Sequence, residues 1–134
     1  MGRGHDVTAI VRGENGSGAE KTVVRDAMEI IKADLAGFDV VVDVAGAWTP
    51  ETVHIVPDVA NLLATLLKGT STRLIVVGGA GSLFVDKDRT KTVADVTPFP
   101  KAVIPMLEAH QRALDDLHGY DDVEWTYISP AGDF

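Results

Sequence analysis

Short apolar runs and longer amphipathic stretches follow one another along the chain. Three runs are dense in β-branched residues and mostly lack polar alternation; they are residues 7–11, 39–44 and 73–77. Such runs are typical of strands buried on both faces of a sheet. Residues 22–25 form a weaker run, and residues 123–128 alternate, with Trp125 and Tyr127 on one side. We therefore expect five strands, the last of them near a sheet edge or with one exposed face.

Residues 51–68 carry apolar side chains at helical spacing, which predicts a helix packed against the sheet. Thr49 is a suitable cap for this helix, and Pro50 suits its first position. Pro57 lies further along the same stretch, where a proline removes one helical hydrogen bond. The pattern therefore leaves two possibilities, a kink at this proline or a helix that begins near Val56.

A second long helix is expected at about residues 101–118, and a shorter helical turn at 32–36. Strands that alternate with helices predict βαβ crossovers, and hence an α/β fold with a doubly wound parallel sheet. The length of 134 residues suits one domain over residues 1–134. The segments with the least predicted structure are the loops 13–21 and 84–100.

Charge and composition narrow the classes of partner. The formal net charge of -8 leaves no basic face for nucleic acid or an anionic membrane. The chain has no cysteine, which excludes disulfides and thiolate chemistry and is compatible with a reducing cytoplasm. No apolar run approaches the roughly 18 residues of a membrane span. We expect a soluble cytoplasmic protein.

Residues at the ends of the expected strands are the first candidates for a binding site, because α/β sheets bind ligands at the carboxyl edge. Arg12 ends the first strand, where an arginine suits the 2′-phosphate of NADP; the alternative is a solvated strand-end arginine. The next two strands end in small or acidic residues, namely Asp26, Ala27, Ala45, Gly46 and Ala47. Small residues let a flat ring lie against the backbone, or simply let a helix pack closely.

The glycine-rich segment 78–82 follows the strongest apolar run. A dinucleotide fingerprint needs a third glycine at position 84 and a helix that begins at once, and Phe84 occupies that position. Ser82 has no base near it in the sequence. The four histidines show no metal-ligand spacing, so no metal site is expected, and His110 is expected in the core or at an interface.

Four segments, residues 3–12, 32–48, 72–83 and 123–134, resemble the NAD(P)H-binding, atypical short-chain dehydrogenase group of NADH-flavin reductase-like and NmrA-like proteins. The resemblance implies a Rossmann-like sheet of order 3-2-1-4-5-6, with NADP or NAD at the carboxyl edge and hydride transfer to a flavin or quinone-like acceptor. It places Arg12 at the adenosine 2′-phosphate of the cofactor, and Asp26 and Ala27 at the adenine. It places Ala45, Gly46 and Ala47 at the ribose. Gly78 and Gly79 would lie near the nicotinamide, and the loop that closes over the nicotinamide would contain Ser129, Pro130 and Ala131.

The chain departs from the group's pattern in several places. The opening strand and its glycine-rich loop are absent, and the group's C-terminal segment would begin after Phe134. The position of the group's active-site hydroxyl falls on Gly79, which leaves Ser82 as a displaced catalytic substitute, and no Tyr-x-x-x-Lys pair is present. The missing strand would lie between the strands that end at Arg12 and Val44. We therefore expect that these two strands pair directly or that a partner chain covers the gap, as in a homo-oligomer.

Three functions remain open at this point. The first is an NAD(P)H-dependent oxidoreductase that acts on a small-molecule acceptor. The second is a non-catalytic NmrA-like module for nucleotide sensing or protein interaction. The third is a shortened gene product without a function of its own.

Overall fold

The computed structural model describes residues 2–130, and its contacts divide the chain into two compact units, Met1–Ala36 and Gly37–Phe134. Each unit has its own sheet, and every strand pair in the two sheets is parallel. The five expected strands and the parallel α/β architecture are confirmed, whereas the prediction of a single domain stays a prediction.

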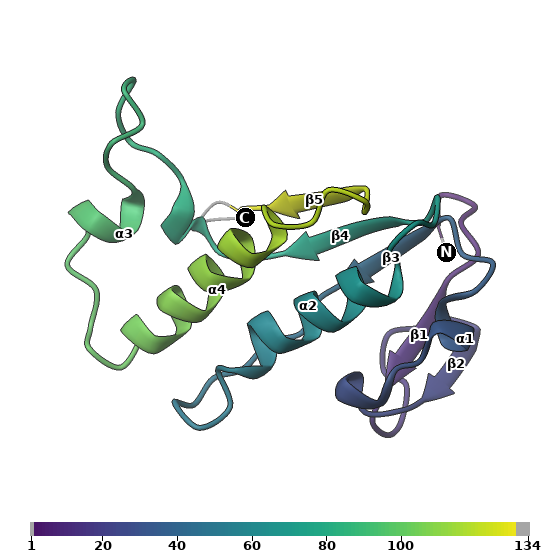
Figure 1. Cartoon of the computed structure of the whole chain (residues 1–134). Helices are drawn as coiled ribbons and strands as arrows, with labels where there is room; N and C mark the ends of the chain where they lie inside the picture. Colours follow the sequence, from purple (N-terminus) through teal and green to yellow (C-terminus); the bar gives the residue numbers. More distant parts are fainter. Residues whose placement is uncertain (1, 131–134) are drawn as a thin grey trace. The chain divides into compact units, whose positions relative to one another are not determined.

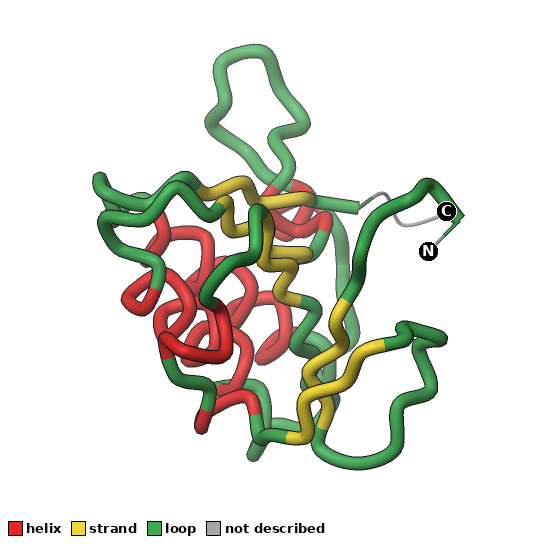
Figure 2. Tube along the Cα trace, turned by 90° about the vertical axis from the view of Figure 1, so that its right-hand side faces the viewer, coloured by secondary structure: helices red, strands yellow, loops and turns green. Residues whose placement is uncertain are grey.

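The first unit is built on two strands, β1 (Thr8–Val11) and β2 (Lys21–Val24), whose register pairs Val11 with Val24. A wide loop joins them (Figure 2). Asn15 organises this loop, because its side-chain amide donates hydrogen bonds to the Ala19 carbonyl at 2.9 Å and to the Thr22 hydroxyl at 2.8 Å. A polar loop without regular structure is thereby held in one conformation.

After β2 the chain forms two short helical turns, η1 (Ala27–Glu29) and α1 (Lys32–Leu35). An ion pair stabilises them, since the Arg25 Nε lies 2.8 Å from the Asp34 carboxylate. Leu35 is buried and Gly37 follows at φ +82°, a left-handed conformation that glycine adopts without strain. The helical turn expected at 32–36 is confirmed.

The second unit contains a three-stranded sheet of order β3-β4-β5, formed by Val40–Asp43, Arg73–Val77 and Trp125–Ile128. Along β4 the side chains alternate, so that Leu74 and Val76 are buried while Arg73 is exposed. One face of the sheet therefore carries the core. The strand β5 is an edge strand, as its alternating pattern predicts.

Two long helices, α2 (Ile55–Leu66) and α4 (Ile104–Leu117), pack side by side in this unit (Figure 1). The expected cap at Thr49 is wrong, because Thr49 belongs to a separate turn in which its carbonyl accepts from Thr52 and Val53 at 3.0 and 3.1 Å. The helix begins at Ile55, which places Pro57 in its first turn, where its missing N–H is not needed.

The segment expected as an open loop at 84–100 has more structure than predicted. It contains the helical turn α3 (Val93–Val96), which follows η2 (Ala80–Ser82) and an antiparallel bridge between Phe84 and Thr92. Thr92 and Asp95 form a reciprocal capping box at the start of α3. The pattern Thr-x-x-Asp in the sequence is the signal that could have identified this turn.

Direct pairing of the strands that end at Arg12 and Val44 does not occur. Among residues 2–130, β1 pairs with β2 and β3 pairs with β4, in two separate sheets. Each of the two strands thus keeps one unpaired edge in the described part of the chain. The other expectation, that a partner chain covers the gap left by the missing strand, stays a prediction.

Candidate functional site

The carboxyl ends of the three strands in the second unit lie at one edge of the sheet. The register pairs Asp43 with Val76 and Val77 with Ile128, so the strands end nearly level. The segments that follow them are therefore neighbours, and they contain most of the residues singled out in the sequence.

Asp43 is the last residue of β3 and is buried, with 6% of its surface exposed. Its carboxylate accepts one hydrogen bond, from the Ala45 N–H at 2.8 Å. Burial raises the pKa of Asp43 to about 6, and the hydrogen bond from Ala45 opposes that rise in part. Sequence reasoning missed this residue, because an aspartate at the end of an apolar run gives no sign of its burial.

The predicted ribose segment, Ala45 to Ala47, leaves β3 without regular structure. Ala47 is buried, whereas Gly46 is exposed and has open space where a Cβ would lie. A flat ligand group can therefore approach the backbone at Gly46. The burial of Ala47 also accounts for its small side chain.

Gly78 and Gly79 directly follow β4 and lie in contact with Tyr127 of β5. A Cβ on Gly78 would overlap the Tyr127 phenol ring, so the ring itself requires a glycine there. The Tyr127 hydroxyl accepts from the Gly79 N–H and donates to the His110 carbonyl, both at 3.3 Å. Burial raises the pKa of Tyr127, and the hydrogen bond from the Gly79 N–H opposes that rise in part.

His110 lies in α4 beside Gly79, with its ring 3.6 Å from the position of a Cβ on that glycine. Its Nδ1 is buried without a hydrogen-bond partner among the described residues, and burial lowers the pKa of the imidazole. The expectation that His110 is a packed residue agrees with this position.

The predicted catalytic residue Ser82 ends η2, at the same edge. Its hydroxyl lies 3.5 Å from the Gly79 carbonyl and 3.3 Å from the hydroxyl of Ser129, which follows β5. The structure thus brings Gly79, Ser82 and Ser129 together, with Pro130 next to Ser129 in the chain. Ala131 lies outside the described residues.

The three remaining predicted residues belong to the first unit. Arg12 follows β1 and has no hydrogen-bond or ion-pair partner within residues 2–130. Arg25, which follows β2, is held by Asp34. Asp26 accepts from the Met28 N–H at 2.9 Å and caps η1, which begins at Ala27. Of the two strand-end arginines, Arg12 is therefore the one available to a ligand.

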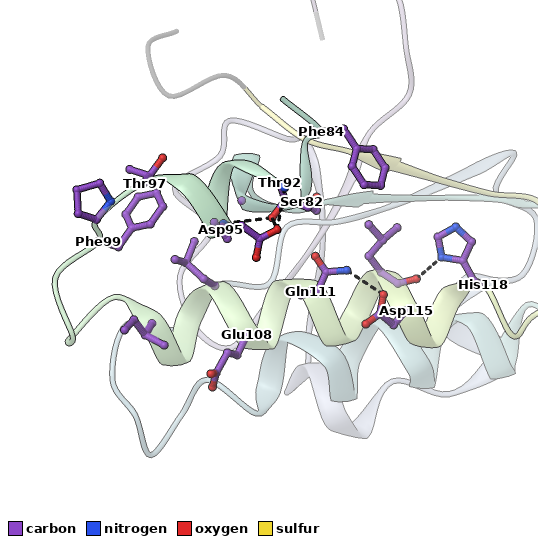
Figure 3. Close-up of a pocket in the computed structure, with 16 residues that line it drawn as sticks. Ser82, Phe84, Thr92, Asp95, Thr97, Phe99, Glu108, Gln111, Asp115 and His118 are labelled. Atoms are coloured by element: carbon purple, nitrogen blue, oxygen red, sulfur yellow. Dashed lines mark hydrogen bonds between the residues drawn. The ribbon is translucent and has the colours of Figure 1, made fainter. Parts of the chain in front are cut away.

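A groove of about 800 Å³ begins at Gly81 and Ser82 and continues between α4 and the segment 84–99 (Figure 3). We call it the α3–α4 groove. Its volume lies in the range of small-molecule sites. The groove is continuous with the serine pair at the sheet edge.

Other kinds of site find no support in the described part of the chain. Residues 2–130 contain no group of three or more metal-ligating side chains. None of the helices described there has the length and apolar character needed to cross a membrane.

The described residues fit one end of a nicotinamide cofactor. Open backbone at Gly46 and the hydroxyls of Ser82 and Ser129 suit a ribose and a carboxamide. Among residues 2–130 no strand–loop–helix unit with a glycine fingerprint is available for the pyrophosphate.

Comparison with known proteins gives relatives but no matching protein-family model. A crystal structure from Streptococcus pneumoniae TIGR4, described as "a putative NADH-flavin reductase", is 45% identical and superposes with a TM-score of 0.94, covering 99% of this chain and 63% of that one. The uncharacterized protein YwnB of Bacillus subtilis is 39% identical over 98% of this chain and 63% of its own length.

A crystal structure described as a "putative epimerase", from Bacteroides thetaiotaomicron, is 26% identical with a TM-score of 0.73, over 98% of this chain and 62% of that one. The chain thus spans a little under two thirds of the length of these relatives. The Rossmann-like fold is shared across all of them that have a solved structure. These likenesses confirm the resemblance of the chain to the atypical short-chain dehydrogenase group with NADH-flavin reductase-like and epimerase-like proteins.

Proposed function

We propose that this chain is part of an NAD(P)H-dependent oxidoreductase that transfers a hydride to a flavin or quinone-like acceptor. The observation that carries the proposal is the convergence of Gly79, Ser82 and Ser129 at the carboxyl edge, beside a groove large enough for an aromatic acceptor. The likeness to the Streptococcus protein supports the choice of reaction.

The residues divide into those that hold the cofactor and those that face the acceptor. Ala45, Gly46 and Ala47 would bind the ribose, and Gly78 and Gly79 would form the backbone surface under the nicotinamide. When bound, the reduced nicotinamide supplies one hydride, and the acceptor takes up that hydride together with one proton. Tyr127 keeps Gly79 in place through its hydroxyl.

Ser82 and Ser129 would orient the acceptor. Their hydroxyls lie 3.3 Å apart, and either can donate a hydrogen bond to a carbonyl or ring nitrogen placed beside them. Pro130 and Ala131, which follow Ser129, would close the site over the nicotinamide. Asp26 and Ala27 would contact the adenine.

NADPH titration monitored by nicotinamide fluorescence, followed by NADPH oxidation with added riboflavin or menadione, tests the proposal. Binding together with acceptor-dependent oxidation is the expected result. Binding without turnover would instead support the nucleotide-sensing module. That alternative has an observation in its favour, since the hydrogen bonds of Ser82 go to Gly79 and Ser129 and to no acid or base. Absence of any binding would contradict both functions.

Arg12 gives a test of cofactor preference. We expect Arg12→Ala to weaken NADPH binding roughly tenfold and to leave NADH binding nearly unchanged, because NADPH alone carries the 2′-phosphate. Arg3→Ala is the matched control, since Arg3 precedes β1 and lies toward the opposite edge of that sheet. An equal loss for both nucleotides would contradict the role of Arg12.

A further inference from the structure

The α3–α4 groove combines an apolar interior with negative charge, and its described lining residues carry no fixed positive charge. One wall is a single face of α4, on which Ile104, Leu107, Gln111 and Leu114 recur at helical spacing. Phe84 lies on the opposite wall and is 55% exposed. An exposed aromatic ring opposite a row of aliphatic side chains is the arrangement that receives a planar ligand.

Three carboxylates line the same groove, those of Asp95, Glu108 and Asp115 (Figure 3). Asp95 accepts from the Thr92 N–H at 2.8 Å and from the Thr92 hydroxyl at 2.9 Å, and these hydrogen bonds lower its pKa. Asp115 accepts from the Gln111 amide at 2.8 Å. Glu108 is exposed and has no partner among the described residues.

The lining contains no lysine and no arginine within residues 2–130. Among the described residues of the lining, His118 is the one basic side chain, and it directly follows the last turn of α4. Its Nδ1 is 2.9 Å from the Leu114 carbonyl, and its ring packs edge-on against Trp125. A phosphate group in this groove would thus meet carboxylates and no permanent cation, which is unfavourable.

We infer that the α3–α4 groove binds a planar aromatic acceptor that carries no phosphate, with riboflavin preferred over its 5′-phosphate, FMN. The inference rests on the proposed function for the kind of ligand, an aromatic acceptor. It rests on the negative charge of the groove for the absence of a phosphate on that ligand. The acceptor ring lies between Phe84 and Leu107, with one edge at Ser82. The carboxylates of Glu108 and Asp115 exclude the phosphorylated form.

Equilibrium binding of riboflavin and FMN, measured by quenching of flavin fluorescence without any nucleotide, tests this directly. The two ligands differ only in the phosphate. At low ionic strength we expect FMN to bind about tenfold more weakly or worse, and the difference to shrink in 0.5 M salt because salt screens the repulsion. Equal affinity of the two flavins would overturn the inference.

Charge variants show whether the groove causes the preference. Glu108→Gln should reduce the ratio of the FMN to the riboflavin dissociation constant roughly threefold, and Glu108→Lys should reduce it further, since Glu108 is exposed and holds no other residue. Asp121→Asn removes one negative charge outside the groove and should leave the ratio unchanged. If Glu108→Gln and Asp121→Asn changed the ratio of dissociation constants equally, the groove would not be the flavin site.

A stacking variant locates the ring independently of charge. Phe84→Ala should weaken riboflavin binding about threefold to tenfold through the loss of aromatic contact. Val85→Ala is the control, because Val85 is the next residue, is 50% exposed and does not line the groove. Unchanged riboflavin affinity in Phe84→Ala would contradict this placement of the ring.

The flavin-binding tests are independent of the proposed reaction, because they need no NADPH. A failure of NADPH oxidation would contradict the proposed reaction and leave the flavin-binding result intact.

Discussion

At the residue scale, Gly78 is fixed by one neighbour, Tyr127. We predict that Gly78→Ala destabilises the fold by about 1 to 3 kcal/mol, because the new methyl group would overlap the phenol ring. Gly79→Ala is the matched control, since a Cβ there meets His110 at an ordinary distance of 3.6 Å. Urea unfolding of both variants measures the difference.

A second variant separates this contact from a general effect of substitution directly after β4. In the background Tyr127→Ala the ring is gone, so Gly78→Ala should cost much less there than in the natural sequence. An equal cost in both backgrounds would show that something other than Tyr127 requires the glycine.

Asp43 predicts a dependence of stability on pH. Its pKa rises from 3.8 in the unfolded chain to about 6 in the folded one, so the folded state binds the proton more tightly. The stabilisation from the protonated carboxyl is fully present below pH 3.8 and is lost as the pH rises through 6. The two pKa values correspond to a loss of about 3 kcal/mol.

Asp43→Asn tests this, because the amide stays neutral and can still accept from the Ala45 N–H. We expect the variant to gain stability relative to the natural protein between pH 4 and 7 in urea unfolding. Asp39→Asn, an exposed position in the same segment, controls for the loss of one negative charge. A constant difference for Asp43→Asn across this pH range would contradict the assignment.

At the scale of elements, α2 and α4 pack against each other, and each buries small residues. Both helices bury alanines, namely Ala60 and Ala64 in α2 and Ala109 and Ala113 in α4. A hydrogen bond of 2.7 Å from Asn61 to Asp116 also joins the two helices. The packing therefore leaves little room at this interface.

We predict that Ala113→Leu destabilises the second unit by about 1 to 3 kcal/mol, because Ala113 is fully buried and a larger side chain forces the helices apart. Ala102→Leu is the control, since Ala102 is exposed just before α4. Thermal unfolding followed by circular dichroism measures both. Similar midpoints would show that the interface has spare volume.

At the scale of the whole molecule, the sheets of the two units differ in how many neighbours each strand is hydrogen-bonded to. The strand β4 is hydrogen-bonded on both sides, whereas β1 and β2 form an isolated pair within the described residues. We predict that hydrogen exchange is slowest in β4 and clearly faster in β1 and β2, because a two-stranded sheet is only marginally stable. Equal protection would mean that another chain covers the first unit.

The unpaired edges of β1 and β3 also support the prediction of a homo-oligomer. Exposed edges readily pair with another chain, and the side chains of Val40 and Val42 on β3 are 43% and 54% exposed. Sedimentation velocity at micromolar concentration should show a species larger than one chain. A monomer at every concentration would contradict this prediction.

Local pattern was enough to predict the strands, the long helices and the fold class. The apolar run at β4 and the stripe along α2 report burial directly, because each element must bury at least one face. The run at β3 was expected to be buried on both faces, and this is wrong for the described residues, since Val40 and Val42 are exposed. The strand ends at Ala45 and Gly78 could be placed at one carboxyl edge, because neighbouring parallel strands end on the same side of their sheet.

Other features depend on contacts between distant residues. The pairing of Ser82 with Ser129, the ring of Tyr127 over Gly78 and the burial of Asp43 join segments that no local pattern connects. The α3–α4 groove likewise forms only where α4 and the segment 84–99 lie opposite each other, and these two walls are separate in the sequence. Sequence periodicity determined which strands and long helices form, because burial acts locally along a strand or helix. The tertiary structure alone decided which of those residues meet, because side chains up to 59 positions apart come into contact only when the strands and helices pack.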